Sequence, residues 1–432
     1  MDKFVIEGGY PLSGTVVPAG NKNAALPILA ASLLTEDELV VGNVPRIRDV
    51  ESMLALLEDL GVSVAWREDH QVVLRASSIT STEVDAELAG RIRASFLLAG
   101  PLLARAGEAR IPPPGGDFIG RRRLDPHLDA LRALGAQVHL DREYEMWAPQ
   151  GLRGNDLFMD EASVMATENT LMAAALTQGT TTIRNAASEP HVQGLAHLLV
   201  QMGARIDGIG SNVLTVHGRR RLGGAKVDIA PDHIEVGSFM ALAAVTGGEM
   251  RIRNTVPDDM KMIRMVFERL GLKSHHDGDD LIIPPEQRLR VRDDVGGAIP
   301  AIDDGPWPAF PADLTSIALA VATQAEGVVL IHEKMFENRL VFVDKLIPMG
   351  ARVVVCDPHR AIVHGPSRLH GERMDSPDIR AGMAMLIASL CAEGVSEIGN
   401  VSQIDRGYER IDDRLRELGA RIERRSTDRV SA

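Results

Sequence analysis

Cationic side chains recur at predicted helix starts or in the loops leading into helices, a pattern that could bind an anion. They are Lys22, Arg93, Arg122, Arg339, Arg380 and Arg406. A helix N-terminus already presents unpaired N–H groups and a partial positive charge. Added cations at several such places favour a small ligand that carries more than one negative charge. For Arg46 and Arg121, a plain solvent-exposed role stays equally open.

Two aspartates stand where acid–base chemistry could occur. Asp117 lies in the insert 111–120, whose prolines stiffen one side and whose glycines free the other, as in a lid with a hinge. Asp313 follows two prolines at the predicted start of a helix. Two ordinary alternatives remain open: Asp117 caps a glycine turn, and Asp313 is a simple helix N-cap.

The elements that must position these side chains repeat six times. A Leu-Gly or Met-Gly pair recurs about every 70 residues, at positions 60–61, 134–135, 202–203, 270–271, 349–350 and 418–419. Each pair predicts a helix closed by glycine, followed in most units by a short strand. An Ala/Leu/Met-rich helix suited to a crowded interior precedes each pair, over 23–34, 93–104, 163–176, 234–246, 313–323 and 380–391.

Length and composition bound the fold and the partners. Alternating strands and helices in 432 residues predict an α/β protein of two lobes with three units each. A net charge of −13 argues against nucleic acid, and no stretch reaches the ~20 apolar residues of a membrane span. The N-terminus lacks an export signal, and two cysteines without metal-ligand spacing suggest a reducing compartment. We therefore expect a cytoplasmic protein, with a frayed polar tail over 423–432.

Six segments in register resemble the UDP-N-acetylglucosamine enolpyruvyl transferases (1-carboxyvinyltransferases) of bacterial wall synthesis. They are NKNAALP at 21–27, RAS at 93–95, PGGD at 114–117, WPAFPAD at 307–313, FENR at 336–339 and IDRGYER at 404–410. Any one segment would be a weak signal, but together they run in order along nearly the whole chain.

The resemblance implies a two-lobed α/β enolpyruvyl transferase fold, an inside-out α/β barrel of six βαβαββ-type units. It implies a first lobe over 22–231, which includes the lid loop 111–121. The second lobe would combine 1–21 with 232–432, so that two crossing strands serve as the hinge. The active site is expected in the cleft between the lobes.

The family transfers the enolpyruvyl group of phosphoenolpyruvate to the 3-hydroxyl of UDP-N-acetylglucosamine and releases phosphate. The resemblance implies no metal or redox cofactor. It also implies no nucleic acid, membrane or obligatory protein partner. The resemblance makes Asp117 the proton donor, Asp313 the general base and Lys22 a third catalytic residue. The implied phosphoenolpyruvate contacts come from Lys22, Arg122 and Arg406 at the phosphate, from Arg339 and Arg380 at the carboxylate, and from Asn23.

For the UDP-sugar, the resemblance implies that Asn23, Asp313 and the backbone near Met335 hold the sugar. The nucleotide diphosphate pocket would be lined by Arg93, Arg122, Arg123, Leu124, Asp125, Pro126, Ser163 and Val164.

The chain departs from the family pattern at the lid and around the nucleotide. Asp117 stands where a cysteine alkylated by fosfomycin is usual, so we expect an enzyme insensitive to that antibiotic. Changes at Arg123, Pro126, Glu161, Met165 and His233 leave two alternatives open: transfer to a different nucleotide acceptor, or a non-catalytic UDP-sugar-binding paralogue. The enolpyruvylshikimate-phosphate synthases share the fold but not the six segments.

Overall fold

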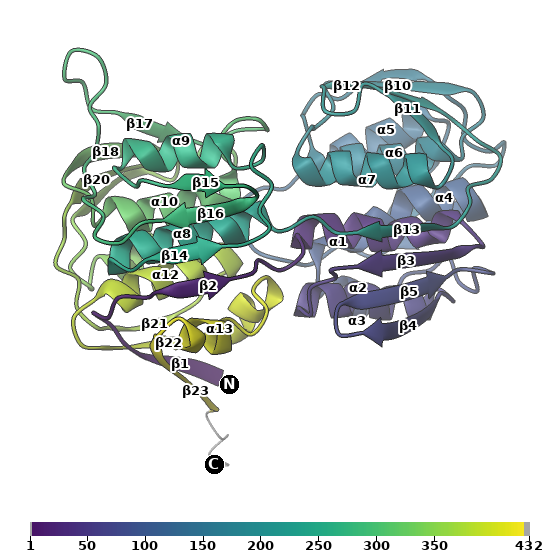
Figure 1. Ribbon diagram of the computed structural model, residues 1–432. Helices are drawn as coiled ribbons and strands as arrows, with labels where there is room; N and C mark the ends of the chain where they lie inside the picture. The colour runs from purple at the N-terminus through teal and green to yellow at the C-terminus, as the bar shows by residue number, and fades with distance from the viewer. Residues whose placement is uncertain (1, 427–432) are drawn as a thin grey trace. The chain divides into compact units, whose positions relative to one another are not determined.

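The structure, a computed structural model, describes residues 2–426 and separates them into two units (Figure 1). The first unit holds 20–117 and 122–230, and the second holds 2–19, 118–121 and 231–426. The lid tip, 118–121, was expected in the first lobe but groups with the second unit. Its backbone explains this, because Asn338 N donates to Ile119 O at 3.0 Å and Arg121 N donates to Glu337 Oε1 at 3.1 Å.

Three sheets form the outer layer of the first unit. Their strand orders are β13(Ala225–Asp228)-β3(Glu38–Gly42)-β5(Gln71–Arg75)-β4(Ser63–Glu68), β6(Glu108–Ile111)-β8(Tyr144–Trp147)-β7(Gln137–Leu140) and β11(Arg205–Asp207)-β12(Val213–His217)-β10(Thr180–Arg184)-β9(Asp156–Phe158). The second unit also has three, ordered β15(His275–Asp277)-β16(Asp280–Ile283)-β14(Met250–Ile252)-β2(Gly14–Val16), β17(Ala301–Asp303)-β18(Gly327–His332)-β20(Arg360–Gly365)-β19(Val353–Asp357) and β21(Arg373–Asp375)-β22(Val395–Gly399)-β1(Asp2–Glu7)-β23(Arg421–Ser426).

The sheets share one pairing scheme, in which one parallel pair is followed by antiparallel strands. The parallel pairs are β13 with β3, β9 with β10, β2 with β14, β17 with β18 and β21 with β22. In the three-stranded sheet, an isolated parallel bridge from Glu83 to Arg110 takes this place beside β6. Strands from the far end of each unit complete its sheets, since β13 pairs with β3 and the N-terminal β1 lies between β22 and β23.

The six predicted small-residue helices are confirmed as the core of the two units. They are α1(Lys22–Ala30) with η1(Ala31–Leu34), η2(Arg93–Leu98) with α4(Ala99–Ala106), α6(Val164–Ala175), α8(His233–Thr246), η3(Ala312–Leu314) with α10(Thr315–Ala322), and α12(Ile379–Cys391). Within each unit they pack on one another, and small residues allow the close approach. A Cβ added at Gly100 would lie 2.3 Å from the backbone oxygen of Asn169.

Five of the six helices predicted to end at a Leu-Gly or Met-Gly pair are confirmed: α2(Arg48–Asp59), α5(Asp125–Ala133), α7(Pro190–Gln201), α9(Lys261–Arg269) and α13(Ile411–Glu417). In the remaining unit, α11(Val343–Leu346) ends earlier, and Met349-Gly350 lies in the turn beyond it. The short helices α3(Ala86–Ala89) and η4(Val401–Arg406) lie elsewhere. Each paired glycine has a positive φ, between 86° and 106°. This left-handed conformation ends a helix at little cost only for glycine, which is why the pair is a reliable local signal.

Within residues 2–426, no helix has the length and apolar character needed to span a bilayer, and no cluster of three His, Cys, Asp or Glu could hold a metal ion. Part of the expected frayed tail is ordered, because 423–426 belong to β23 and pair with β1. The remainder of that tail, 427–432, lies outside the described residues.

Candidate active site

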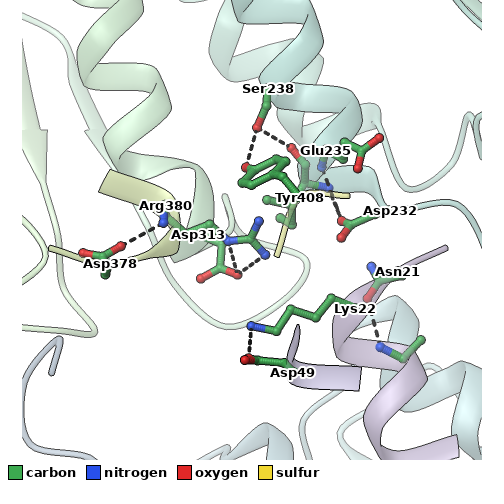
Figure 2. Close-up of polar contacts among 12 residues, drawn as sticks. Asn21, Lys22, Asp49, Asp232, Glu235, Ser238, Asp313, Asp378, Arg380 and Tyr408 are labelled. Atoms are coloured by element: carbon green, nitrogen blue, oxygen red, sulfur yellow. Dashed lines mark hydrogen bonds and ion pairs between the residues drawn. The ribbon is translucent and has the colours of Figure 1, made fainter. Parts of the chain in front are cut away.

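Asp313 is half-buried and forms ion pairs with two buried arginines of the second unit, and Figure 2 shows its contact with Arg380. Its Oδ1 accepts a hydrogen bond from Arg339 Nη2 at 2.5 Å, and its Oδ2 contacts Arg380 Nε at 3.1 Å and Nη2 at 3.0 Å. Arg339 is 3% exposed and Arg380 is 4% exposed. Asp313 is the second residue of η3, whose N-cap is Pro311, so the simple N-cap alternative does not apply. We call Asp313, Arg339 and Arg380 the arginine–aspartate cluster.

Local structure fixes both arginines of this cluster. Arg380 is the second residue of α12, whose N-cap Asp378 accepts hydrogen bonds from the backbone N–H groups of Arg380 at 2.8 Å and Ala381 at 2.9 Å. Arg339 lies in the turn that follows β18, with Asp378 Oδ1 at 3.9 Å from its Nη1. Its guanidinium lies 5.6 Å from the Phe336 ring centroid.

Two N–H groups of this cluster are buried without a hydrogen-bond partner among the described residues, Arg339 Nε and Arg380 Nη1. A buried donor left unpaired costs about 1–3 kcal/mol, and more when it is charged. Burial, the largest single influence, lowers the pKa of both arginines, but Asp313 and the other acidic groups around them together raise the pKa above its usual value. The cluster therefore presents permanent positive charge and spare donors, which suits an anionic ligand.

Tyr408 and Arg406 come from the segment after β22. Tyr408 is fully buried under Arg380, whose guanidinium carbon is 5.4 Å from the ring centroid, and its hydroxyl shares a 2.9 Å hydrogen bond with Ser238. Burial raises the pKa of Tyr408, so its phenol is neutral. Arg406 ends η4 and donates from Nη1 to Gln403 Oε1 at 2.9 Å.

Lys22 is the first residue of α1 in the first unit, and its ammonium is nearly buried. Its Nζ lies 2.6 Å from Asp49 Oδ2, and Asn21 caps the same helix by accepting from Ala24 N at 2.9 Å (Figure 2). No sequence motif singles out Asp49, which comes from the first turn of α2. Asn23 follows on α1 and is half-buried.

His127 lies beside two arginines predicted to meet the nucleotide. Arg93 Nη2 donates to Arg122 O at 2.5 Å, and Asn169 Nδ2 lies 3.0 Å from His127 Nδ1. Burial, reinforced by the charges of Arg93 and Arg122, lowers the pKa of His127 to about 3. The imidazole is therefore neutral, and its Nδ1 accepts from the Asn169 amide. Sequence reasoning missed His127, although it directly follows the predicted segment 122–126.

The other predicted nucleotide contacts differ in exposure. Arg123 pairs with acids, because its Nη1 is 2.9 Å from Asp160 Oδ2 and its Nε is 3.4 Å from Asp125 Oδ2. Leu124 and Pro126 are buried, Ser163 caps α6 by accepting from Ala166 N, Val164 begins that helix, and Met335 is half-buried in the second unit.

The lid starts from a rigid stem in the first unit. Gly115 donates its N–H to Ala89 O at 3.1 Å, and a Cβ added there would lie 1.8 Å from Gly90 O. Gly116 has a φ of +98° and passes close to Arg93. The next residue, Asp117, is half-buried, while Phe118 is 86% exposed. The stem thus fixes where the lid begins, immediately before the proposed proton donor.

The predicted residues therefore form groups within each unit. The second unit brings Asp313, Arg339 and Arg380 into direct contact, and it also carries Met335 and Arg406. The first unit carries the remainder, with Arg93 bonded to the backbone of Arg122 and Lys22 paired with Asp49.

Known proteins match this chain over almost its full length. A family model described as EPSP synthase (3-phosphoshikimate 1-carboxyvinyltransferase) matches residues 6–415. A UDP-N-acetylglucosamine 1-carboxyvinyltransferase of Bradyrhizobium diazoefficiens is 57% identical over 422 residues, which cover 98% of each chain. The chain belongs to the UDP-N-acetylglucosamine 1-carboxyvinyltransferase family. Another protein of this name, from Treponema denticola, is 53% identical and matches 98% of this chain and 99% of its own.

The crystal structure of the enolpyruvyl transferase NikO from Streptomyces tendae confirms the predicted fold of this family member. It superposes with a TM-score of 0.87 and covers 99% of both chains, at 24% sequence identity. Identity this low supports the fold alone, so the enolpyruvyl transferase fold is confirmed and nothing about the acceptor follows from it.

Proposed function

We propose that the protein transfers the enolpyruvyl group of phosphoenolpyruvate to the 3-hydroxyl of UDP-N-acetylglucosamine and releases phosphate. This is the first committed step of peptidoglycan precursor synthesis. Relatives named for that activity are 57% and 53% identical over nearly the whole chain. The observation that carries the proposal is the arginine–aspartate cluster, where Arg339 Nε and Arg380 Nη1 are buried donors without a hydrogen-bond acceptor among the described residues.

Phosphoenolpyruvate carries a carboxylate and a phosphate, and the proposal gives each its own cations. Arg339 and Arg380 bind the carboxylate through their unpaired N–H groups. Lys22, Arg122 and Arg406 bind the phosphate, and Asn23 contacts the same ligand. Each charge-assisted contact contributes on the order of 1.5–3 kcal/mol. The Lys22 ammonium has three donors, so it binds the phosphate while it keeps its contact with Asp49, and that contact orients the ammonium.

The reaction then needs one acid and one base. Asp117 delivers a proton to the methylene carbon of phosphoenolpyruvate, and the sugar 3-hydroxyl adds to the neighbouring carbon. Asp313 takes the hydroxyl proton. Loss of a proton from the resulting methyl group, and of phosphate from the neighbouring carbon, restores the double bond and gives the enolpyruvyl ether. Asp313 is held by two arginines before the ligand arrives, so its orientation is set in advance.

The nucleotide part of the UDP-sugar is proposed to bind residues of the first unit, and its sugar to bind residues of both units. Asn23, Asp313 and the backbone of Met335 hold the sugar. Arg93, Arg122, Leu124, Asp125, Pro126, Ser163 and Val164 line the diphosphate and uridine. Arg123 contacts the diphosphate only by exchanging its ion pair with Asp160. The neutral imidazole of His127 keeps the Arg93 and Arg122 segment in place through its contact with Asn169.

The proposal extends to the setting in which the enzyme works. We place it in the cytoplasm, acting without a metal or redox cofactor and without a nucleic acid, a membrane or an obligatory protein partner. The reaction written above balances without any such group.

The deciding experiment is the release of inorganic phosphate from phosphoenolpyruvate in the presence of UDP-N-acetylglucosamine. We expect release only when both substrates are present. Release that requires another nucleotide, or no release with any acceptor, would contradict the proposal. Arg380→Lys keeps a charge but loses the forked donors, so it should raise the KM for phosphoenolpyruvate at least tenfold. Arg373→Lys, at a side chain that is 82% exposed, is the matched control.

A further inference from the structure

Asp304 and Glu333 are two buried acidic residues, and Glu333 interacts electrostatically with Arg339 of the arginine–aspartate cluster. Glu333 directly follows β18 and is 0% exposed, and Asp304 directly follows β17 and is 3% exposed. Asp303 pairs with His332 in the parallel register of β17 and β18, so Asp304 and Glu333 follow at neighbouring positions, and the hydrogen bond to Asp304 is among the causes that raise the pKa of Glu333. Glu333 Oε2 and Asp304 Oδ2 receive no hydrogen bond from any other group in the described part of the chain.

We propose that Asp304 and Glu333 hold one proton between them, and that this carboxyl pair positions residues 334–339 for substrate binding. This inference rests on the proposed function, because its effect is read through Arg339. Neither residue is proposed to touch a substrate, so both are positioning residues.

The need for a proton follows from the surroundings of the pair. Two adjacent buried carboxylates repel each other, whereas one shared proton makes a strong hydrogen bond. The groups facing Glu333 are Asp304, the cationic Arg339, the Thr315 hydroxyl and His359, whose Nδ1 lies 2.7 Å from Glu333 O. Burial, and then the hydrogen bond to Asp304, raises the pKa of Glu333 to about 9 even though Arg339 opposes this. The pair therefore keeps its proton at neutral pH.

The other oxygen of each carboxyl group fixes the backbone that follows. Asp304 Oδ1 accepts a short hydrogen bond from Lys334 N, and Glu333 Oε1 accepts one from Phe336 N at 3.2 Å. The next residues meet the lid tip and the cluster. Asn338 N donates to Ile119 O, and Arg339 Nη2 donates to Asp313. If the pair lost its proton, the two negative charges would repel each other. This repulsion would separate the C-terminal ends of β17 and β18 and displace residues 334–339.

The pH dependence of phosphoenolpyruvate use tests the pair. For wild-type enzyme we expect kcat/KM for phosphoenolpyruvate to fall about tenfold per pH unit above pH 9, mainly through KM, as one proton is lost. Glu333→Gln and Asp304→Asn each supply an amide N–H in place of the shared proton. Either variant should remove this alkaline fall while its kcat at pH 7.5 stays within about twofold of wild type.

The matched control is Asp303→Asn. Asp303 directly precedes Asp304, but its side chain is exposed and pairs with Lys334 Nζ at 2.8 Å. This variant should keep the wild-type profile. An alkaline fall that persists in both amide variants, or that is absent from wild type, would overturn the inference.

A spectroscopic measurement tests the proton without relying on turnover. With ¹³C-carboxyl-labelled glutamate, the infrared difference between pH 7 and pH 10.5 should show a carboxylic-acid C=O band in wild type that Glu333→Gln lacks. Buried Glu168, whose pKa burial also raises, contributes equally to both proteins. A band unchanged in Glu333→Gln contradicts the inference, even if the phosphate-release assay has already rejected the proposed function. Should that variant not fold, the same comparison is made with Asp304→Asn.

Discussion

Asp117, the proposed proton donor, lies in a loop without regular secondary structure. Its neighbours Gly115 and Gly116 are held against 89–93, so the carboxyl group is delivered from a fixed stem. We predict that Asp117→Asn lowers kcat by roughly 10²- to 10⁴-fold, which is the usual contribution of a general acid. Steady-state phosphate release measures this, with Asp141→Asn at an exposed turn as the control. Near-normal turnover in Asp117→Asn would rule out the proton-donor role.

The same residue governs the predicted response to fosfomycin. A carboxylate is a poor nucleophile for the epoxide, whereas a thiolate attacks it readily. Wild-type enzyme should therefore show no time-dependent inactivation, and Asp117→Cys should gain it while retaining turnover. Incubation with fosfomycin followed by an activity assay and intact-protein mass measurement compares the two. A covalent adduct on the wild type would contradict this prediction.

His127 is kept neutral mainly by its burial, which lowers its pKa. Its pKa is about 3 in the folded protein against about 6.5 in the unfolded chain, so the unfolded state binds more protons between these values. The contribution of His127 to the free energy of unfolding should therefore be complete above pH 6.5. It should be lost as the pH drops toward 3, which lowers the free energy of unfolding by on the order of a few kcal/mol. Urea unfolding at pH 4, 5 and 7 should show a smaller fall in His127→Gln. His197→Gln, at an exposed site, should match wild type.

At the scale of helices and strands, the paired glycines show why local signals are reliable. Gly271 and Gly419 both end helices of the second unit with a positive φ, of 86° and 98°. A Cβ added at Gly419 meets only Pro11 O at 3.8 Å, whereas at Gly271 it would lie 2.4 Å from Arg290 N. The first change introduces conformational strain alone, and the second adds a backbone clash.

We therefore predict that Gly419→Ala lowers the free energy of unfolding by about 1–2 kcal/mol, and that Gly271→Ala lowers it further. Thermal unfolding of the two variants, monitored through the second unit, is the measurement. Equal destabilisation would show that the backbone near Arg290 yields at no cost.

At the scale of the whole molecule, the chain ends matter because strands distant in sequence complete the sheets. Phe4 of β1 is fully buried in the second unit's core, and its strand pairs with β22 and β23. Phe4→Ala should destabilise this unit by about 3–5 kcal/mol, as expected for a large buried side chain. Hydrogen exchange should then quicken in 395–399 but not in 180–184 of the first unit, and the exposed Glu7→Gln should change neither. Faster exchange in both units would contradict two separate cores.

Much of the fold could be predicted because its signals are local. The small-residue helices and the glycine-closed helices follow from side-chain size and from the φ that glycine allows, so their observed limits fall within a few residues of those predicted. The pairing of β1 with β22, and of β13 with β3, carried no such signal, because a strand does not record which distant strand completes its hydrogen bonds.

The six-unit α/β pattern, the family and the kinds of charged residue at the site could all be predicted from the amino-acid sequence, since each depends on neighbouring residues or on motifs in order. The contacts of Asp313 with Arg339 and Arg380, the pairing of Lys22 with Asp49, the lowered pKa of His127 and the raised pKa of Glu333 became apparent only in the folded chain. Burial and the charges of residues far away in sequence set these states, and both exist only once the chain has folded.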